Sequence, residues 1–120
     1  MKSTGLACAL LGMVVLAPDP AAAQAPETRQ LKCDVGPVTK TYAKTQWLVY
    51  SCDDSRSLVI VAAPGNPAAP FYFMMSPNDA GYQLDAEGTG QKDIASAAAE
   101  EIRKLSASDI AALIRETTSR

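Results

Sequence analysis

The chain has 120 residues, a formal net charge of −2 and 48% hydrophobic residues, which fits one small globular domain. It contains no run of lysine or arginine and no basic stripe with interleaved aromatic residues, so its composition argues against a nucleic-acid binder. It contains no histidine, which removes the commonest general base and the commonest metal ligand. We therefore expect neither a cofactor nor a metal site.

The first 25 residues have the layout of a secretory signal peptide. Lys2 supplies the positive charge and Gly5–Ala17 the apolar core, and the alanines that follow allow cleavage after Ala23 or Ala25. We expect cleavage after Ala23, because the later cut would place Pro26 beside the scissile bond. The apolar core is too short to span a bilayer comfortably, so we expect no membrane span after cleavage. These features predict a periplasmic or secreted protein.

Two cysteines remain once Cys8 leaves with the signal peptide, and they are Cys33 and Cys52. An even number of cysteines in an oxidising compartment predicts a structural disulfide. A redox or metal pair is the alternative, and the spacing does not favour it because it is not that of a C-x-x-C motif.

Alternating residues over Leu31–Val35 predict a first strand with one buried face. Gly36-Pro37 interrupts this strand, which should therefore lie at a sheet edge or be broken in two. Val38–Tyr42 resumes the extended pattern, and a turn at Ala43–Thr45 would fold the chain back. Such a hairpin would bring the two cysteines together.

Three apolar runs rich in β-branched and aromatic residues predict the middle of the sheet. They are Trp47–Tyr50, Leu58–Ala63 and Phe71–Met75, separated by segments with turn chemistry. The segment that contains Tyr82, Leu84 and Ala86 alternates with polar residues and predicts a half-buried last strand.

The end of the chain has helical periodicity. We expect a glycine turn at 87–90 with Thr89 as the N-cap of a helix that begins at Gln91. Ser106 and Asp109 have the spacing of a capping-box variant and predict the start of a second helix. The expected buried stripes of the two helices contain Ile94, Ala97, Ala98, Ile102 and Leu105, and then Ile110, Leu113 and Ile114. The last residues, from Thr117 to Arg120, should fray.

Strands followed by helices predict an α+β domain, an antiparallel meander of about five strands followed by two C-terminal helices packed on the sheet. We expect a signal peptide at 1–23, a flexible lead-in at 24–30 and this single domain at 31–118. The expected core contains Trp47 or its neighbours, Val49, Leu58, Ile60, Val61, Phe71, Phe73, Leu84, Ile94, Ile102, Ile110 and Leu113.

The three apolar runs carry more hydrophobic residues than such a fold needs. A sheet with helices on one face should alternate apolar with polar residues, and these runs do not. Period-two geometry places Phe71, Phe73 and Met75 on one face and Tyr72 and Met74 on the other. The second face must be covered by a curled sheet, the N-terminal segment, a second copy of the protein or another partner.

These patterns predict an exported binding domain without catalytic activity, which engages a protein or a small apolar ligand through a sheet and aromatic surface. The candidate surface consists of Tyr42, Trp47, Tyr50, Tyr72, Met74 and Tyr82. The partner could be a second copy, giving a homodimer, or a protein of the cell envelope. Two alternatives stay open: a structural or assembly component of the bacterial cell envelope, and a small hydrolase that uses Asp53 or Asp54.

Overall fold

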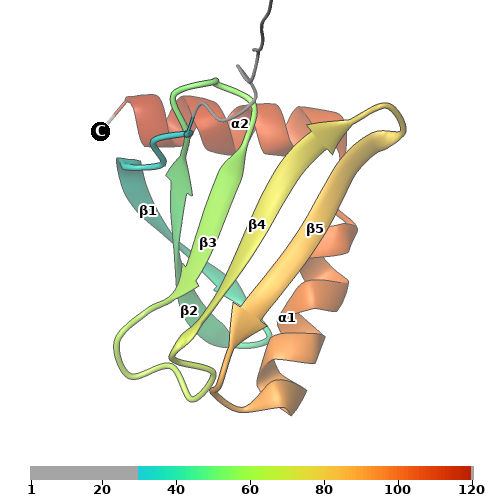
Figure 1. Ribbon diagram of the computed structural model, residues 1–120. Helices are drawn as coiled ribbons and strands as arrows, with labels where there is room; N and C mark the ends of the chain where they lie inside the picture. The colour runs from blue at the N-terminus through green and yellow to red at the C-terminus, as the bar shows by residue number, and fades with distance from the viewer. Residues whose placement is uncertain (1–29, 120) are drawn as a thin grey trace, which may run out of the picture. The chain divides into compact units, whose positions relative to one another are not determined.

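A five-stranded antiparallel sheet is backed by two helices in the computed structural model, which describes residues 30–119 (Figure 1). The described residues from Leu31 onward form one compact unit. The predicted signal peptide and the predicted lead-in, apart from its last residue Gln30, lie outside the described residues. Their predictions therefore stay predictions.

The strands pair in chain order and the helices come last. The strands are β1 (Val35–Tyr42), β2 (Thr45–Ser51), β3 (Leu58–Ala62), β4 (Phe71–Asn78) and β5 (Gly81–Gly88), and the helices are α1 (Lys92–Arg103) and α2 (Ala107–Thr118). The sheet order is β1-β2-β3-β4-β5, with every neighbouring pair antiparallel. The predicted α+β meander followed by two helices is confirmed.

Both helices lie on the same side of the sheet, behind the strands in the view of Figure 1. The core fills the space between the two layers, and Trp47 and Phe73 lie at its centre with their rings 5.3 Å apart. Most of the predicted core is buried there. Val61 of β3 points to the opposite face and is only half-buried.

The buried side of α1 shares Ala98 and Ile102 with the predicted stripe and differs from it at the other positions. Ala95, Ala98, Ala99 and Ile102 are buried, whereas Ala97 is exposed. Alanine-rich sequence does not determine which face of a helix is buried, because small residues are tolerated on either side. Among the residues predicted for the core, Leu84 and Ile94 are half-buried and pack against it.

The first strand starts later than its sequence pattern suggests. β1 includes Gly36-Pro37, and the register shifts between Val35 and Val38, as expected for a bulge. β1 lies at the edge of the sheet, where proline is tolerated. Residues 31–34 are not part of the strand, although the Lys32 carbonyl accepts a bond from the Asp53 N–H at 2.8 Å.

The predicted disulfide joins Cys33 to Cys52, just before β1 and just after β2. It lies beside the bond between Lys32 and Asp53, so a covalent and a backbone link hold the start of the unit to the end of β2. Because disulfides persist in oxidising environments, this link agrees with an oxidising compartment.

The start of α1 corrects the prediction of a Thr89 cap. Gln91 is the N-cap and makes no side-chain cap bond, while the Thr89 N–H donates to the Pro70 carbonyl at 3.0 Å. A Cβ atom at Gly88 or Gly90 would overlap the backbone near Pro70 or Ala68. The glycines therefore allow two loops to approach closely instead of preparing a helix cap.

Helix α2 has the predicted capping box, in which Ser106 Oγ accepts from the Asp109 N–H and the Asp109 carboxylate accepts from the Ser106 N–H. Its far end does not fray within the described residues, contrary to the prediction. Thr117 is 1% exposed, and its hydroxyl lies 2.7 Å from that of Ser51.

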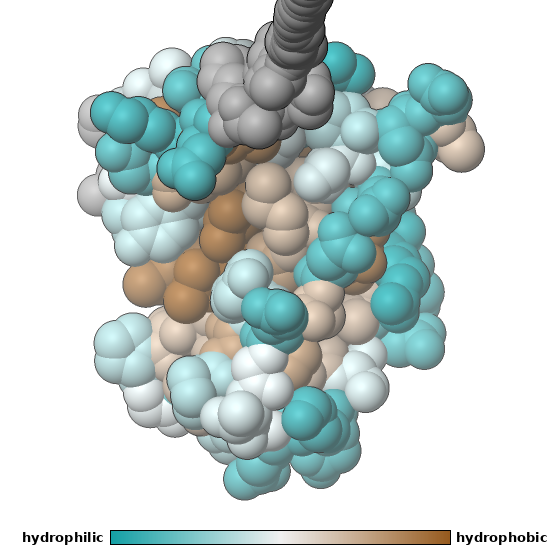
Figure 2. Space-filling model, in the orientation of Figure 1, coloured by the Kyte–Doolittle hydropathy of each residue, from teal (hydrophilic) through white to brown (hydrophobic). Residues whose placement is uncertain are grey.

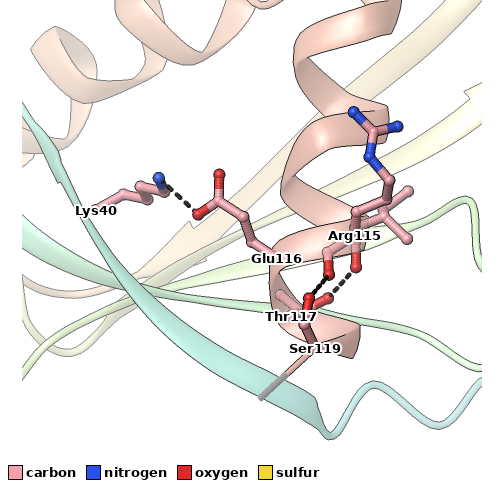
Figure 3. Close-up of polar contacts among 6 residues, drawn as sticks. Lys40, Arg115, Glu116, Thr117 and Ser119 are labelled. Atoms are coloured by element: carbon pink, nitrogen blue, oxygen red, sulfur yellow. Dashed lines mark hydrogen bonds and ion pairs between the residues drawn. The ribbon is translucent and has the colours of Figure 1, made fainter.

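Two exposed contacts add to this end of α2 (Figure 3). Lys40 Nζ of β1 lies 2.8 Å from Glu116 Oε1, and Ser119 Oγ donates to the Arg115 carbonyl at 2.6 Å. The second bond closes the last helical turn, while the ion pair links the helix to the edge strand.

Candidate interaction surface

The face of the sheet turned away from the helices is apolar over its middle strands. We call this surface the open face, and its apolar residues form two cross-strand rows. The residues are Leu48, Val61 and Tyr72 in one row and Tyr50, Val59 and Met74 in the other. Tyr72 is 41% exposed and the other five are half-buried. Figure 2 shows hydrophobic residues gathered across the middle of this face, with hydrophilic residues toward its right side.

The six aromatic and methionine residues selected from sequence divide between the two faces. Tyr50, Tyr72 and Met74 lie on the open face, as the strand pairing shows. The other three point toward the helices, and they are Tyr42, Trp47 and Tyr82. The six residues therefore do not form one surface. The strand register decides which residues of different strands share a face, and the sequence alone does not give that register.

Trp47 and Tyr42 belong to the core for a clear physical reason. Trp47 is 0% exposed and Tyr42 is 8% exposed. The Trp47 Nε1–H donates to the Tyr42 carbonyl at 3.1 Å and to Thr45 Oγ1 at 3.0 Å. The indole N–H is therefore satisfied inside the hairpin, and the ring can be buried without cost to its polar atom. Burial raises the pKa of Tyr42, and the nearby Glu116, Glu101 and Asp109 carboxylates raise it further.

Sequence reasoning missed Leu48, Val59 and Val61 as surface residues. Each lies within an unbroken apolar run, which identifies a strand but not the direction of each side chain. The exposure of Tyr72 on β4 determines their direction through the pairs Tyr72–Val61 and Val61–Leu48. The apolar pattern identifies these three residues as surface residues only when it is combined with the strand register.

A groove of about 820 Å³ runs over one end of the open face. Leu48, Val59 and Val61 contribute to its apolar surface, and Pro64 and Pro70 of the β3–β4 loop line it as well. Tyr72, Glu87, Gly88 and Thr89 complete its β4 and β5 side. Its size is within the range of small-molecule binding sites, which are mostly apolar with a few polar groups.

The loop beside the groove is held in place by the side chain of Asn66. Asn66 Nδ2 donates to the Gln46 carbonyl at 2.7 Å, and Asn66 Oδ1 accepts from the Ala68 N–H at 2.8 Å. Further along, the Gln91 N–H donates to the Pro67 carbonyl at 3.2 Å. These bonds connect the loop both to β2 and to the start of α1, so the groove is largely preformed.

The β5 side of the open face is acidic. The Tyr72 hydroxyl donates to Glu87 Oε1 at 3.1 Å, and this bond, together with the negative charge of Glu87, raises the pKa of Tyr72. One row away, Asp85 is paired with Met74 and lines a smaller hollow of about 440 Å³ with it. At the opposite edge of the open face, Thr39 of β1 extends the row of Leu48 with a neutral side chain.

The two adjacent aspartates considered for a hydrolase are used by a turn. Asp54 Oδ1 accepts from the N–H groups of Arg56 and Ser57, both at 2.9 Å, and Oδ2 accepts from the Ser57 hydroxyl at 2.6 Å. Burial raises the pKa of Asp54, but these hydrogen bonds and the Arg56 charge outweigh it and hold the pKa below its ordinary value. Asp53 Oδ1 accepts from the Lys32 N–H at 3.3 Å. Both carboxylates therefore act as local acceptors.

Within residues 30–119, no group of three or more acidic or cysteine side chains is placed to hold a metal ion. In the same range, no helix is long and apolar enough to cross a membrane. Comparison with family models, with curated proteins and with solved structures finds no match for this chain. The open face and its groove are therefore the basis for a functional proposal.

Proposed function

We propose that this chain is an exported, disulfide-stapled binding domain without catalytic activity, which uses its open face to hold a protein or a small apolar ligand. The observation that carries the proposal is the apolar groove over Leu48, Val59 and Val61, on the face that neither helix covers. Contiguous apolar surface of this kind on a soluble protein marks a binding site more often than chance would give.

The chemistry of the open face suits binding. Tyr72 has an amphipathic ring and Met74 an adaptable thioether, and both types of side chain fit varied partners. The groove is bordered by a loop that internal hydrogen bonds already fix, so little ordering is needed when a ligand enters. A second copy of the chain or an envelope protein could occupy the same face.

The compartment is part of the proposal. The Cys33–Cys52 disulfide supports a periplasmic or secreted location, because such bonds are rare where thiols are kept reduced. The signal-like sequence before it agrees with that location. A structural role in the bacterial cell envelope would use the same face and the same compartment.

The turn geometry supports binding over hydrolysis. Both Asp54 oxygens accept hydrogen bonds from the turn, so this carboxylate is held by the N–H groups of Arg56 and Ser57 and by the Ser57 hydroxyl. A catalytic carboxylate of this class would instead face substrate in a cleft.

The proposal is tested with Nile red, a neutral apolar probe whose fluorescence rises in an apolar site. We expect saturable binding to the purified protein, and we expect Leu48→Ser with Val61→Ser to weaken it by about tenfold, because two aliphatic side chains that line the groove are lost. Ala97→Ser is the matched control, since Ala97 is exposed on α1.

Light scattering on the same samples reports whether a second copy occupies the face. A dimer that dissociates in the Tyr72→Ser, Met74→Ser variant would support binding of a protein through the open face. A monomer that binds no probe, and whose double variants unfold, would contradict the proposal, because both faces would then be ordinary core.

A further inference from the structure

We propose that the groove selects an amphiphilic cation, a small molecule with an aliphatic body and a positively charged head, through Glu87. This inference rests on the proposed function and adds the charge of the ligand to it. It comes from the position of a carboxylate at the border of an otherwise apolar groove.

The first argument is the placement of Glu87. It lines the groove together with Val61 and Tyr72. Of the residues that line the groove in the described part of the chain, Glu87 alone carries a charge. Glu87, Tyr72, Val61 and Leu48 lie in one row across the sheet, so the carboxylate ends a continuous apolar strip. A ligand lying along this strip would place its aliphatic part on Leu48 and Val61 and its head at Glu87.

The second argument is that no basic residue of the described part of the chain pairs with this carboxylate. In residues 30–119 the ion pair that forms joins Lys40 to Glu116, and Lys40 lies on the helix side of β1. Glu87 is exposed and accepts a neutral hydrogen bond from the Tyr72 hydroxyl. Among residues 30–119, no lysine or arginine side chain lies within ion-pair distance of it.

The third argument is charge complementarity over the whole face. At the strand positions of residues 30–119 that point to the open face, the charged side chains are Asp85 and Glu87, and both are acidic. The outer row positions on β1 are threonines, Thr39 and Thr41. A cationic head is attracted to the β5 side, whereas an anionic head meets repulsion there.

Three eight-carbon compounds that differ in charge test the proposal: octylammonium, 1-octanol and octanoate. Their affinities for the purified protein are measured by calorimetry, and the site is located from amide shifts in an NMR spectrum. We expect octylammonium to bind about three- to fivefold more tightly than 1-octanol, the effect of one partly exposed ion pair, and octanoate to bind most weakly. The shifts should centre on Val59, Val61 and Tyr72.

Two variants separate charge from fold. Glu87→Gln should abolish the preference, so that octylammonium and 1-octanol bind with similar affinity. Glu100→Gln is the matched control, because Glu100 is an exposed carboxylate on α1. If Glu87→Gln should fail to fold, the salt dependence of the unaltered protein decides, since the preference for octylammonium must fall as added salt screens the pair.

The outcomes distinguish this inference from the function on which it rests. Equal affinity for all three compounds, unchanged by Glu87→Gln, would overturn the charge selection and leave an apolar binding domain. Failure of all three compounds and of Nile red to bind would overturn both. Binding that appears only in the dissociated Tyr72→Ser, Met74→Ser variant would mean that a second copy occupies the groove. Binding that appears only in a chain without residues 1–30 would mean that the leading segment occupies it. Either result would overturn the proposed ligand.

Discussion

The two faces of the sheet are made by the same strands from similar residues, yet their side chains differ in how far they are exposed to solvent. On the helix side, Val49, Ile60 and Phe73 are at most 1% exposed. On the open face, their immediate neighbours Leu48, Val59 and Tyr72 are half-buried or exposed. The difference shows that a helical layer, and not the hydropathy of a strand, decides which side chains become core.

The largest test of this comparison uses two adjacent residues of β4. Phe73→Ala should lower the free energy of unfolding by about 3–5 kcal/mol, because it opens a cavity beside the Trp47 ring. Tyr72→Ala removes a side chain of similar size from the open face and should change stability little. Urea unfolding of both variants measures the contrast. Equal losses would mean that the open face is as tightly packed as the core.

The disulfide gives the next largest effect and tests a part of the molecule that belongs to neither apolar face. Replacing both Cys33 and Cys52 by serine should lower the free energy of unfolding by about 2–5 kcal/mol, the usual cost in a small secreted domain. Chemical unfolding measures it, with the unaltered protein in reducing agent as the control. Two reactive thiols in the unfolded, unreduced protein would contradict the bridge.

The smallest test compares one tyrosine from each face. The pKa of Tyr42 is raised first by burial, whereas that of Tyr72 is raised first by its bond to Glu87. Glu87→Ala should return the pKa of Tyr72 toward its ordinary value of 10.0 and leave that of Tyr42 raised. Titration followed by NMR of ring-labelled tyrosine resolves the two residues.

The sign of the associated stability follows from the direction of the shift. A raised pKa means that the folded state favours the neutral phenol of Tyr72. The contribution of the bond to Glu87 is therefore complete below the ordinary pKa and is lost as the pH rises through the pKa of the folded state. A Tyr72 pKa that Glu87→Ala leaves unchanged would show that the bond is not formed in solution.

Local sequence features predicted the elements well, because their causes are local. Apolar runs bounded by turn residues identify β2, β3 and β4, and the Ser106–Asp109 spacing identifies the start of α2. The cysteine pair followed from counting and from the hairpin. None of these inferences needs a contact between distant parts of the chain.

The features that sequence reasoning missed all depend on distant contacts. Thr117 is buried because it meets Ser51, which lies 66 residues earlier. The loop beside the groove owes its shape to the bond from Asn66 to the Gln46 carbonyl, across 20 residues. Glu87 became a candidate only when the register put it in one row with Tyr72 and Val61. Polar residues in such roles have no periodic pattern that would identify them.

The acidic side of the open face has a consequence for solubility. β5 is the last strand of the sheet, so within the described residues one side of its backbone has no neighbouring strand. Such an edge is a template for pairing with another chain, and charged side chains are a common natural protection. Asp85 and Glu87 lie along this edge, and two copies aligned edge to edge would bring four carboxylates close together. The carboxylates that we assign to ligand selection thus also disfavour uncontrolled growth of the sheet from one molecule to the next.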